Sequence, residues 1–384
     1  MQVSENIVYI GVDDRTTDLF EGQFALPNGI AYNSYVILDE KIAVFDTVDE
    51  NYGDEWLAKL QTALQGRLPD FLIVQHMEPD HSANVLRFAK HYPSAKIVSS
   101  QKAFVMMKNY FGQDFADRQI VVNDGDKLPL GERTLTFLHA PMVHWPEVFV
   151  TYEEKEKVLF SADAFGKFGA LDVKDDWACE ARRYYFGIVG KYGVQVQALL
   201  KKLSAYAIKT ICPLHGPALK ENLAYYLGLY DTWSRYGVES DGVVIAYTSV
   251  YGHTKKAVEL LAQKLKEKGV AKVVVNDLAR VDMAEAVEDA FRYGKIVLAT
   301  TTYNGEIFPF MREFLHELTE RKFSGRTVAF IENGSWSPTA AKVMRGMLEN
   351  CKNLQFAENG VRILSALNEE SIAQVDALAC ELCN

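Results

Sequence analysis

The sequence contains few cysteines, no excess of positive charge and no long apolar run. Its 384 residues include five cysteines, Cys179, Cys212, Cys351, Cys380 and Cys383. This odd and sparse set excludes a disulfide framework and fits a reducing compartment. The net charge of −10 argues against nucleic acid or an anionic membrane as a partner. No apolar run approaches the length of a membrane span, and the N-terminal residues lack the pattern of a secretory signal. We therefore expect a soluble, cytoplasmic protein with no nucleic-acid or membrane partner.

Several familiar binding modules are also missing. There is no four-cysteine rubredoxin-like module, no NAD-binding fingerprint and no P-loop lysine. Cys380 and Cys383 form a single C-x-x-C, and no second pair is present to complete a metal site with it. The simplest interpretation of this pair is two ordinary residues on a last helix.

The length and the rhythm of the sequence indicate two domains. A chain of 384 residues with 48% hydrophobic and 24% charged residues has an ordinary globular balance and exceeds the usual size of one domain. Two halves of different pattern meet at the polar, glycine-containing segment 237–242 (GVESDG). We predict one domain over residues 1–239 and a second over residues 240–384.

In the first half, short apolar runs come in close pairs. Residues 35–47 (YVILDEKIAVFDT) have the pattern of a hairpin, and residues 134–163 that of successive strands. A helical pattern covers Glu180–Leu203. These features predict an α/β sandwich with mixed sheets.

In the second half, strands and helices alternate strictly, which predicts a doubly wound parallel sheet of flavodoxin size. The expected strands are residues 242–247, 271–278, 295–301, 327–333 and 360–364. The expected helices are Lys255–Lys268, Met283–Phe291, Phe310–Arg321, Thr339–Asn350 and Glu369–Leu382.

Potential metal ligands follow an apolar strand in the segment FLIVQHMEPDHSAN. They are His76, Glu78, Asp80 and His81, and their spacing can direct two ligands one way and two another. By itself this pattern could arise by chance. Three further candidates, His144, Asp163 and His215, each lie just beyond an apolar run, where sheet-based sites are built. Taken singly, Asp163 is better explained as part of a capped turn, and His144 and His215 as ordinary loop histidines; together the seven predict a two-metal site.

The ligand types favour iron over zinc. Two zinc ions in a hydrolase are held mostly by histidine, whereas Glu78 stands where a zinc motif would place a third histidine. Carboxylates mixed with imidazoles suit iron, which also changes oxidation state. A dinuclear zinc hydrolase with an accessory flavodoxin module is the alternative. A non-catalytic electron-transfer module is a third interpretation, against which the complete ligand set argues.

Three loops at predicted strand ends could hold a flavin. The first has hydroxyl groups and a glycine at the start of a helix, which suits a phosphate, and it resembles the phosphate loop of flavodoxins. Tyr303 and Trp336, in the other two loops, could pack against a planar isoalloxazine ring. The FMN-binding candidates are Thr248, Ser249, Val250, Tyr251, Gly252, His253, Thr254, Thr301, Thr302, Tyr303, Asn304, Gly305, Asn333, Gly334, Ser335 and Trp336.

Together these motifs resemble the flavodiiron proteins over essentially the whole chain. The resemblance implies an N-terminal metallo-β-lactamase-like αββα sandwich and a C-terminal flavodoxin-like domain. It further implies that His76, Glu78 and His144 hold one iron, that Asp80, His81 and His215 hold the other, and that Asp163 bridges them. The segments NSYVILDE, HWPE, SADAFG, ARRYYFGIVGKYG and CPLHGP are also similar to the family's.

The sequence departs from the family pattern in three places. Glu21 stands where some members place a histidine near the substrate pocket. At His144 the chain reads HWPEVFVTY, whereas many members carry an aspartate and a small residue after this histidine. The third flavin loop lacks the glycine-rich form common in the family. By similarity, Glu21 and Tyr192 are the candidate catalytic pocket residues.

The resemblance implies an oxidoreductase that passes electrons from FMN to two non-haem irons. Reduced FMN and two ferrous ions together store the four electrons that take O2 to water; coupling two NO molecules to N2O needs two. Because the chain lacks a donor module, a rubredoxin, a ferredoxin or a reduced-cofactor reductase is expected to supply electrons. The resemblance also implies a head-to-tail homodimer, or a dimer of dimers.

Overall fold

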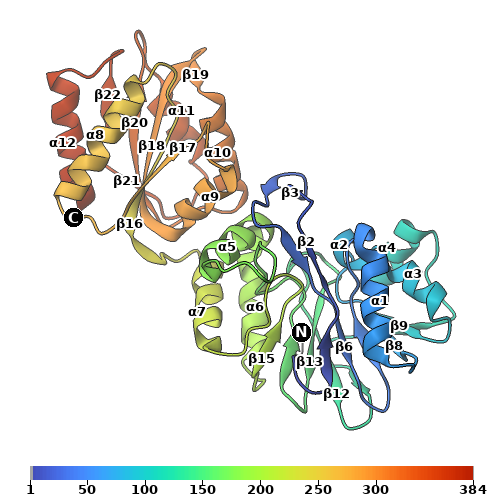
Figure 1. Cartoon of the computed structure of the whole chain (residues 1–384). Coiled ribbons are helices and arrows are strands. Elements are labelled where there is room, and N and C mark those ends of the chain that lie inside the picture. Colours follow the sequence, from blue (N-terminus) through green and yellow to red (C-terminus); the bar gives the residue numbers. More distant parts are fainter. Residues whose placement is uncertain (1–2, 384) are drawn as a thin grey trace. The chain divides into compact units, whose positions relative to one another are not determined.

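The computed structural model describes residues 3–383, which form two compact units that meet at Asp231 and Thr232 (Figure 1). This division lies a few residues before the domain boundary predicted at 239/240, which stays a prediction. Within the described residues, no helix combines the length and the apolar character that crossing a membrane requires.

The first unit contains two mixed sheets packed face to face. One has the order β1-β6-β7-β8-β9-β10 and the other the order β11-β12-β13-β14-β15. The first consists of β1 (Ile7–Tyr9), β6 (Tyr35–Ile37), β7 (Ala43–Phe45), β8 (Phe71–Ile73), β9 (Lys96–Ser99) and β10 (Gln119–Val121). The second consists of β11 (Lys127–Pro129), β12 (Thr134–His139), β13 (Phe149–Glu153), β14 (Val158–Phe160) and β15 (Thr210–Cys212). Two short pairs are β2 (Val12–Asp14) with β5 (Ile30–Tyr32), and β3 (Leu19–Phe20) with β4 (Phe24–Ala25).

The core of this unit lies between the two sheets. Phe45 of one sheet stacks on Phe160 of the other, with ring centroids 4.0 Å apart. Helices lie on the outer sides of both sheets (Figure 1). Beside the first sheet are η1 (Glu50–Tyr52), α1 (Gly53–Leu64), α2 (Pro79–Ser82), α3 (Val85–His91) and α4 (Gln101–Phe111); beside the second are α5 (Trp177–Tyr184), α6 (Gly193–Leu203) and α7 (Leu223–Ser234). The predicted αββα sandwich is confirmed.

The helix predicted over Glu180–Leu203 is in fact two helices. Between α5 and α6 lie a π-helical turn, η2 (Tyr185–Val189), and a 3-10 turn, η3 (Gly190–Tyr192). Gly187 lies in the π-helical turn, and a Cβ atom there would be 2.9 Å from the ring of Phe24. The glycines of this segment disfavour a continuous helix and allow that close approach, which periodicity alone does not reveal.

The second unit is a doubly wound sheet in the order β17-β16-β18-β20-β21, with β22 also parallel to β20. Its strands are β16 (Ser240–Tyr247), β17 (Val273–Asp277), β18 (Tyr293–Tyr303), β20 (Thr327–Asn333), β21 (Gln355–Phe356) and β22 (Val361–Ile363), and β19 (Glu306–Ile307) pairs antiparallel with the end of β18. Its helices are α8 (His253–Glu267), α9 (Met283–Arg292), α10 (Pro309–Glu320), α11 (Ala340–Met347) and α12 (Glu369–Cys383). The predicted flavodoxin-like architecture is confirmed.

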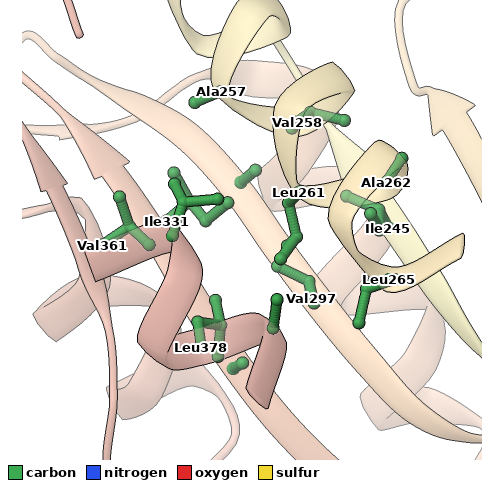
Figure 2. Packing of buried hydrophobic residues seen from close by; sticks show 14 of the residues in the cluster. Ile245, Ala257, Val258, Leu261, Ala262, Leu265, Val297, Ile331, Val361 and Leu378 are labelled. Carbon is green, nitrogen blue, oxygen red and sulfur yellow. The ribbon is translucent and has the colours of Figure 1, made fainter. Parts of the chain in front are cut away.

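The helices α8 and α12 pack on one face of this sheet. Figure 2 shows Leu261 of α8 and Leu378 of α12 beside Val297 of the central strand β18. This buried apolar layer fixes the start of α8 against the end of β16, so that the connecting loop lies at the carboxyl edge of the sheet. Ligands of doubly wound folds bind at that edge.

Candidate metal centre and flavin cavity

The segment after β8 carries four ionisable side chains into the interior of the first unit. His76 and Glu78 precede the short helix α2, and Asp80 and His81 lie within it; all four are buried. Pro79 at the first position of α2 starts the helix without requiring a backbone donor. The turn between strand and helix separates the two pairs of side chains, as the spacing predicted.

One group of side chains forms around Glu78. The Nε2 atoms of His76 and His144 lie 3.2 and 3.0 Å from Glu78 Oε2. The same two atoms lie 3.1 Å from Asp163 Oδ2. These four residues offer atoms that all lie within 4.8 Å of one another, which is close enough for one ion.

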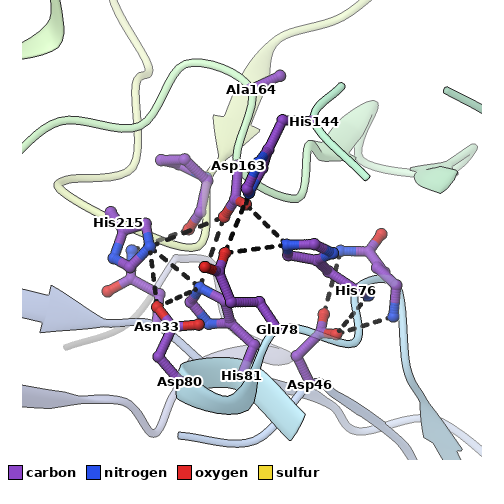
Figure 3. A network of polar contacts seen from close by, with 12 residues as sticks. Asn33, Asp46, His76, Glu78, Asp80, His81, His144, Asp163, Ala164 and His215 are labelled. Carbon is purple, nitrogen blue, oxygen red and sulfur yellow. Dashed lines mark hydrogen bonds and ion pairs between the residues drawn. The ribbon is translucent and has the colours of Figure 1, made fainter. Parts of the chain in front are cut away.

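A second group forms around Asp80. The Nε2 atoms of His81 and His215 lie 3.1 and 3.3 Å from Asp80 Oδ2, and 3.0 Å from each other. They are 3.5 and 3.7 Å from Asp163 Oδ1. Each of the two groups therefore faces a different oxygen of the Asp163 carboxylate (Figure 3).

Asp163 is held between the groups by a tightly bonded turn after β14. Ala162 and Phe165, on either side of it, have φ angles of 50° and 67°, values that cost free energy for residues other than glycine. The turn is fixed by a hydrogen bond from Ser161 Oγ to Ala164 O and by one from the Leu214 amide to Ala162 O. Such strain persists only where the surrounding structure enforces it, here at the centre of the cluster.

The outward ring nitrogens of two histidines are also fixed. His76 Nδ1 lies 2.9 Å from Glu147 Oε1, which accepts the Met77 amide as well. His215 Nδ1 lies 2.8 Å from Ala31 O. These contacts orient the rings with Nε2 toward the cluster, as the partners of metal-bound histidines do.

The electrostatics of the cluster call for positive charge. Burial alone would raise the pKa of Asp163, but His76 and its neighbours hold that pKa well below its usual range. Burial would likewise lower the pKa of His81, but Asp80 and Asp163 raise it to about 10. Burial is also outweighed at His144, where Asp163 and Glu78 raise the pKa to about 9. The carboxylates thus favour positive charge among the histidines, and metal ions bound to the Nε2 atoms of neutral imidazoles can supply that charge in place of protons.

In the second unit, a cavity of about 760 Å³ opens at the carboxyl edge of the sheet. Most of its lining comes from the strand ends and connections between β16 and α8, between β18 and β19, and between β20 and α11, and Ser365 beyond β22 adds to it. A cavity of this size suits a ligand as large as a flavin mononucleotide. The Thr301 hydroxyl in its wall is buried and has no hydrogen-bond partner among the described residues, so it is a donor left for a ligand.

Of the sixteen flavin-binding candidates, fourteen line the cavity, and Thr248 and Gly252 do not. Thr248 is buried, and its hydroxyl is 2.6 Å from that of Thr300. Gly252, with a φ of 85°, precedes the first residue of α8. Three lining residues were not predicted, Ser337, Thr339 and Ser365.

Comparison with known proteins follows the same division of the chain. Residues 30–216 match the model of the ODP family of beta lactamases, and residues 244–359 match that of a flavodoxin domain. A nitric oxide reductase of Moorella thermoacetica is 28% identical over 369 residues, covering 93% of this chain and 92% of that protein. The fold is similar to that of rubredoxin oxygen:oxidoreductase from Desulfovibrio gigas, with a TM-score of 0.92 and 24% identity, covering 100% of this chain and 97% of that one. A flavodiiron protein from Giardia intestinalis also has a TM-score of 0.92, with 23% identity over 99% of this chain and 95% of its own.

The chain belongs to the flavodiiron protein family.

The cofactors of a flavodiiron protein fit the residues present. The carboxylate oxygens of Asp80 and Asp163 are buried, yet no N–H group of residues 3–383 reaches them in hydrogen-bond geometry. Buried carboxylates without such bonds are costly unless a cation binds them. Three carboxylates and four imidazoles are ligands that iron accepts. The cavity of the flavodoxin domain, lined by neutral donors, fits FMN.

The pocket residues predicted from the family pattern differ in how the structure places them. Glu21 lies in the turn between β3 and β4 with its carboxyl beside Glu78; desolvation and that neighbouring charge raise the pKa of Glu21 to about 7. Tyr192 lies in η3 with a half-buried side chain, and its pocket role stays a prediction.

Besides Glu147, two residues beside the flavodiiron centre were missed. Tyr184, at the end of α5, is fully buried with its ring 5.4 Å from that of His215, and its hydroxyl has no hydrogen-bond partner within the described part of the chain. A tyrosine within a helix is ordinarily part of the core, so no local signal marks it. Asp46 is buried behind His76, and its Oδ1 accepts the Gln75 amide at 2.8 Å. Its place directly after β7 is a signal that could have found it.

Proposed function

We propose that this chain is an oxidoreductase that reduces O2 to water, NO to N2O, or both, at two irons supplied with electrons by FMN. The observation that carries the proposal is the position of Asp163, whose two carboxylate oxygens face two separate groups of buried ligands. The names of the relatives, a nitric oxide reductase and a rubredoxin oxygen:oxidoreductase, support both substrates.

In this proposal, His76, Glu78 and His144 would hold one iron, and Asp80, His81 and His215 would hold the other. Asp163, whose two oxygens face the two groups, would serve both. The proposal is supported by the convergence of the Nε2 atoms within each group. Iron is favoured over the alternative pair of zinc ions because of the share of carboxylates and because a flavodoxin domain, present in the same chain, carries electrons.

The irons and FMN, when bound, supply the redox chemistry: four electrons and four protons for each O2, or two electrons and two protons for each pair of NO molecules. The protein positions the substrate and excludes water. We propose that Tyr184 donates its hydroxyl hydrogen bond to the small molecule at the centre, since its ring lies 5.4 Å from that of His215 and its buried hydroxyl has no partner among residues 3–383. Glu21 and Tyr192 are proposed as pocket residues.

In the second unit, we propose that the start of α8 holds the FMN phosphate and that Tyr303 and Trp336 flank the ring. The amides in the first turn of a helix attract a phosphate without a lysine. Both aromatic side chains line the cavity, with Tyr303 44% and Trp336 81% exposed, which leaves ring surface for a planar ligand.

The electron donor and the assembly are also proposals. We propose a separate donor protein such as a rubredoxin, a ferredoxin or a reduced-cofactor reductase, a cytoplasmic location, and a head-to-tail homodimer or a dimer of dimers. The dimer can be tested by mixing a chain without iron (His76→Ala with His81→Ala) and a chain without flavin. Recovery of activity in mixed dimers is expected; its absence in proven heterodimers would contradict the arrangement.

The proposed function is tested by metal and flavin analysis combined with anaerobic stopped-flow. Purified protein made with ample iron should contain about two irons and one FMN per chain. The reduced protein should be reoxidised by O2, by NO, or by both. Full zinc occupancy with hydrolase activity, or protein that binds no FMN, would contradict the proposal.

A further inference from the structure

The flavin cavity is lined by one side chain of a type that changes charge near neutral pH. His253 is the first residue of α8, and it lines the cavity. An imidazole ordinarily gains or loses its proton between pH 5 and 8. Among the described residues, the other titratable groups in the lining are the phenols of Tyr251 and Tyr303, and a phenol ordinarily remains neutral in that range.

His253 lies at the end of the cavity suited to a phosphate. The loop before it turns at Gly252, and Ser249 Oγ accepts the amides of Gly252 and Lys255 at 3.1 and 3.2 Å. The first-turn amides of a helix carry partial positive charge and favour an anion. The imidazole is therefore attached to the same turn that would hold the phosphate.

No permanently charged side chain lines this cavity among the described residues. The loops after β18 and β20, and Ser365 beyond β22, contribute hydroxyl, amide, glycine and aromatic groups only. The nearest lysines along α8 are Lys255 and Lys256, which are not in the lining, and Lys255 Nζ lies 3.8 Å from Glu259. A proton on His253 is thus the one side-chain positive charge that the cavity can offer.

We propose that His253 makes FMN binding proton-linked, so that the protonated imidazole bonds the phosphate and contributes more to the FMN affinity at pH 6 than at pH 8. This rests on the proposed flavin site. A histidine that gains an anionic partner keeps its proton to higher pH when that partner is bound. The extra affinity is therefore complete at low pH and is lost as the pH rises through the titration of the complex.

The phosphate itself works in the opposite direction. A phosphate monoester loses its second proton near pH 6, and the dianion binds a helix N-terminus more strongly. The effect of His253 is therefore isolated by comparing two proteins at each pH rather than by one pH profile. His253→Asn removes the titrating group and keeps a polar side chain.

The experiment is a fluorescence-quenching titration of FMN into flavin-free protein between pH 6 and 8. We expect the ratio of the FMN Kd of His253→Asn to that of the unchanged protein to be about ten at pH 6 and to approach one at pH 8. Riboflavin, which lacks the phosphate, should show the same ratio at both pH values. His316→Asn, which replaces an exposed histidine on α10, is the matched control and should behave as the unchanged protein does.

A ratio that does not change with pH for FMN would overturn the proposal, as would an equal change for riboflavin. If His253→Asn does not fold, judged by circular dichroism, His253→Gln takes its place. Failure of the unchanged protein to bind FMN at any pH would contradict the flavin half of the proposed function, and this inference with it. If the unchanged protein binds FMN but the ratio of the two Kd values stays constant between pH 6 and 8, this inference alone is overturned.

Discussion

The two sites of this chain differ in the chemical character of their side chains. The candidate metal centre consists of seven buried ionisable side chains, and the flavin cavity consists mainly of small neutral groups with exposed aromatic side chains. A bare cation has to be held by ligand charge, so removing one ligand unbalances its neighbours. A phosphate and a flat ring can be held by backbone dipoles and contact area, which are spread over many residues. Single substitutions should therefore have large effects at the first site and graded effects at the second.

The largest expected effect is that of Asp163→Ala. Removing the carboxylate takes a ligand oxygen from each group and leaves buried carboxylates facing one another. Iron content should fall well below two per chain, and turnover should fall by about 100-fold or more. Iron analysis and stopped-flow measure both.

FMN content and reduction by an artificial donor should be unchanged in Asp163→Ala. The control is Asp124→Ala, which removes a surface aspartate that pairs with Lys202. Normal turnover with both irons bound would remove Asp163 from the centre and with it the contrast between the sites.

Glu147→Gln should have the next largest effect. Its Oε1 accepts from His76 Nδ1 and from the Met77 amide, so the substitution weakens the contact that orients the ring. Iron affinity should fall by about 10- to 100-fold, measured by competition with a chelator. Glu132→Gln, at an exposed ion pair with Lys155, should leave it unchanged. Equal affinity in both variants would show that the ring needs no outer support.

At the flavin cavity, Ser249→Asp should weaken FMN binding by about tenfold. It places a carboxylate beside the expected phosphate, at a helix end that already holds the loop through Ser249. Flavin fluorescence measures the affinity, and iron content should not change. Asn353→Asp adds the same charge at an exposed position of the same unit and should be neutral. A loss of FMN in that control would mean that net charge, not the loop, decides binding.

The smallest expected effect is on the free energy of unfolding, and it distinguishes a tyrosine of the pocket from a tyrosine of the core. Tyr184→Phe removes a buried hydroxyl without a partner, so the free energy of unfolding should stay the same or rise by about 1 kcal/mol, while turnover falls. Tyr35→Phe removes a hydroxyl that donates to Pro213 O at 3.0 Å, and should cost about 1 kcal/mol. Urea unfolding compares the two. A destabilised Tyr184→Phe with normal turnover would assign Tyr184 to the core.

The sequence identifies the predicted metal ligands better than it identifies the residues that contact and orient them. The seven predicted ligands could be found because each is a polar residue just beyond an apolar strand, and folding brings strand ends together. Glu147 and Tyr184 escaped because their importance comes from contacts between distant segments. A glutamate in a loop and a tyrosine in a helix carry no local mark of that role.

The same limit applies to the fold. The alternating strands and helices of the second unit were predicted because each is long enough to show its period. The helix expected over Glu180–Leu203 failed because the close packing of Gly187 against Phe24 is a tertiary contact. Similarly, Ser365 lines the flavin cavity directly after the strand predicted over residues 360–364, and a single serine at that strand end carries no local mark of such a role.

The most direct test is anomalous diffraction at the iron edge on crystals of the iron-loaded protein. The account predicts two iron peaks roughly 3.5–4 Å apart. One should lie among His76, Glu78 and His144, and the other among Asp80, His81 and His215, with one Asp163 oxygen toward each. A single peak, or two peaks that do not share Asp163, would contradict the bridged two-iron centre.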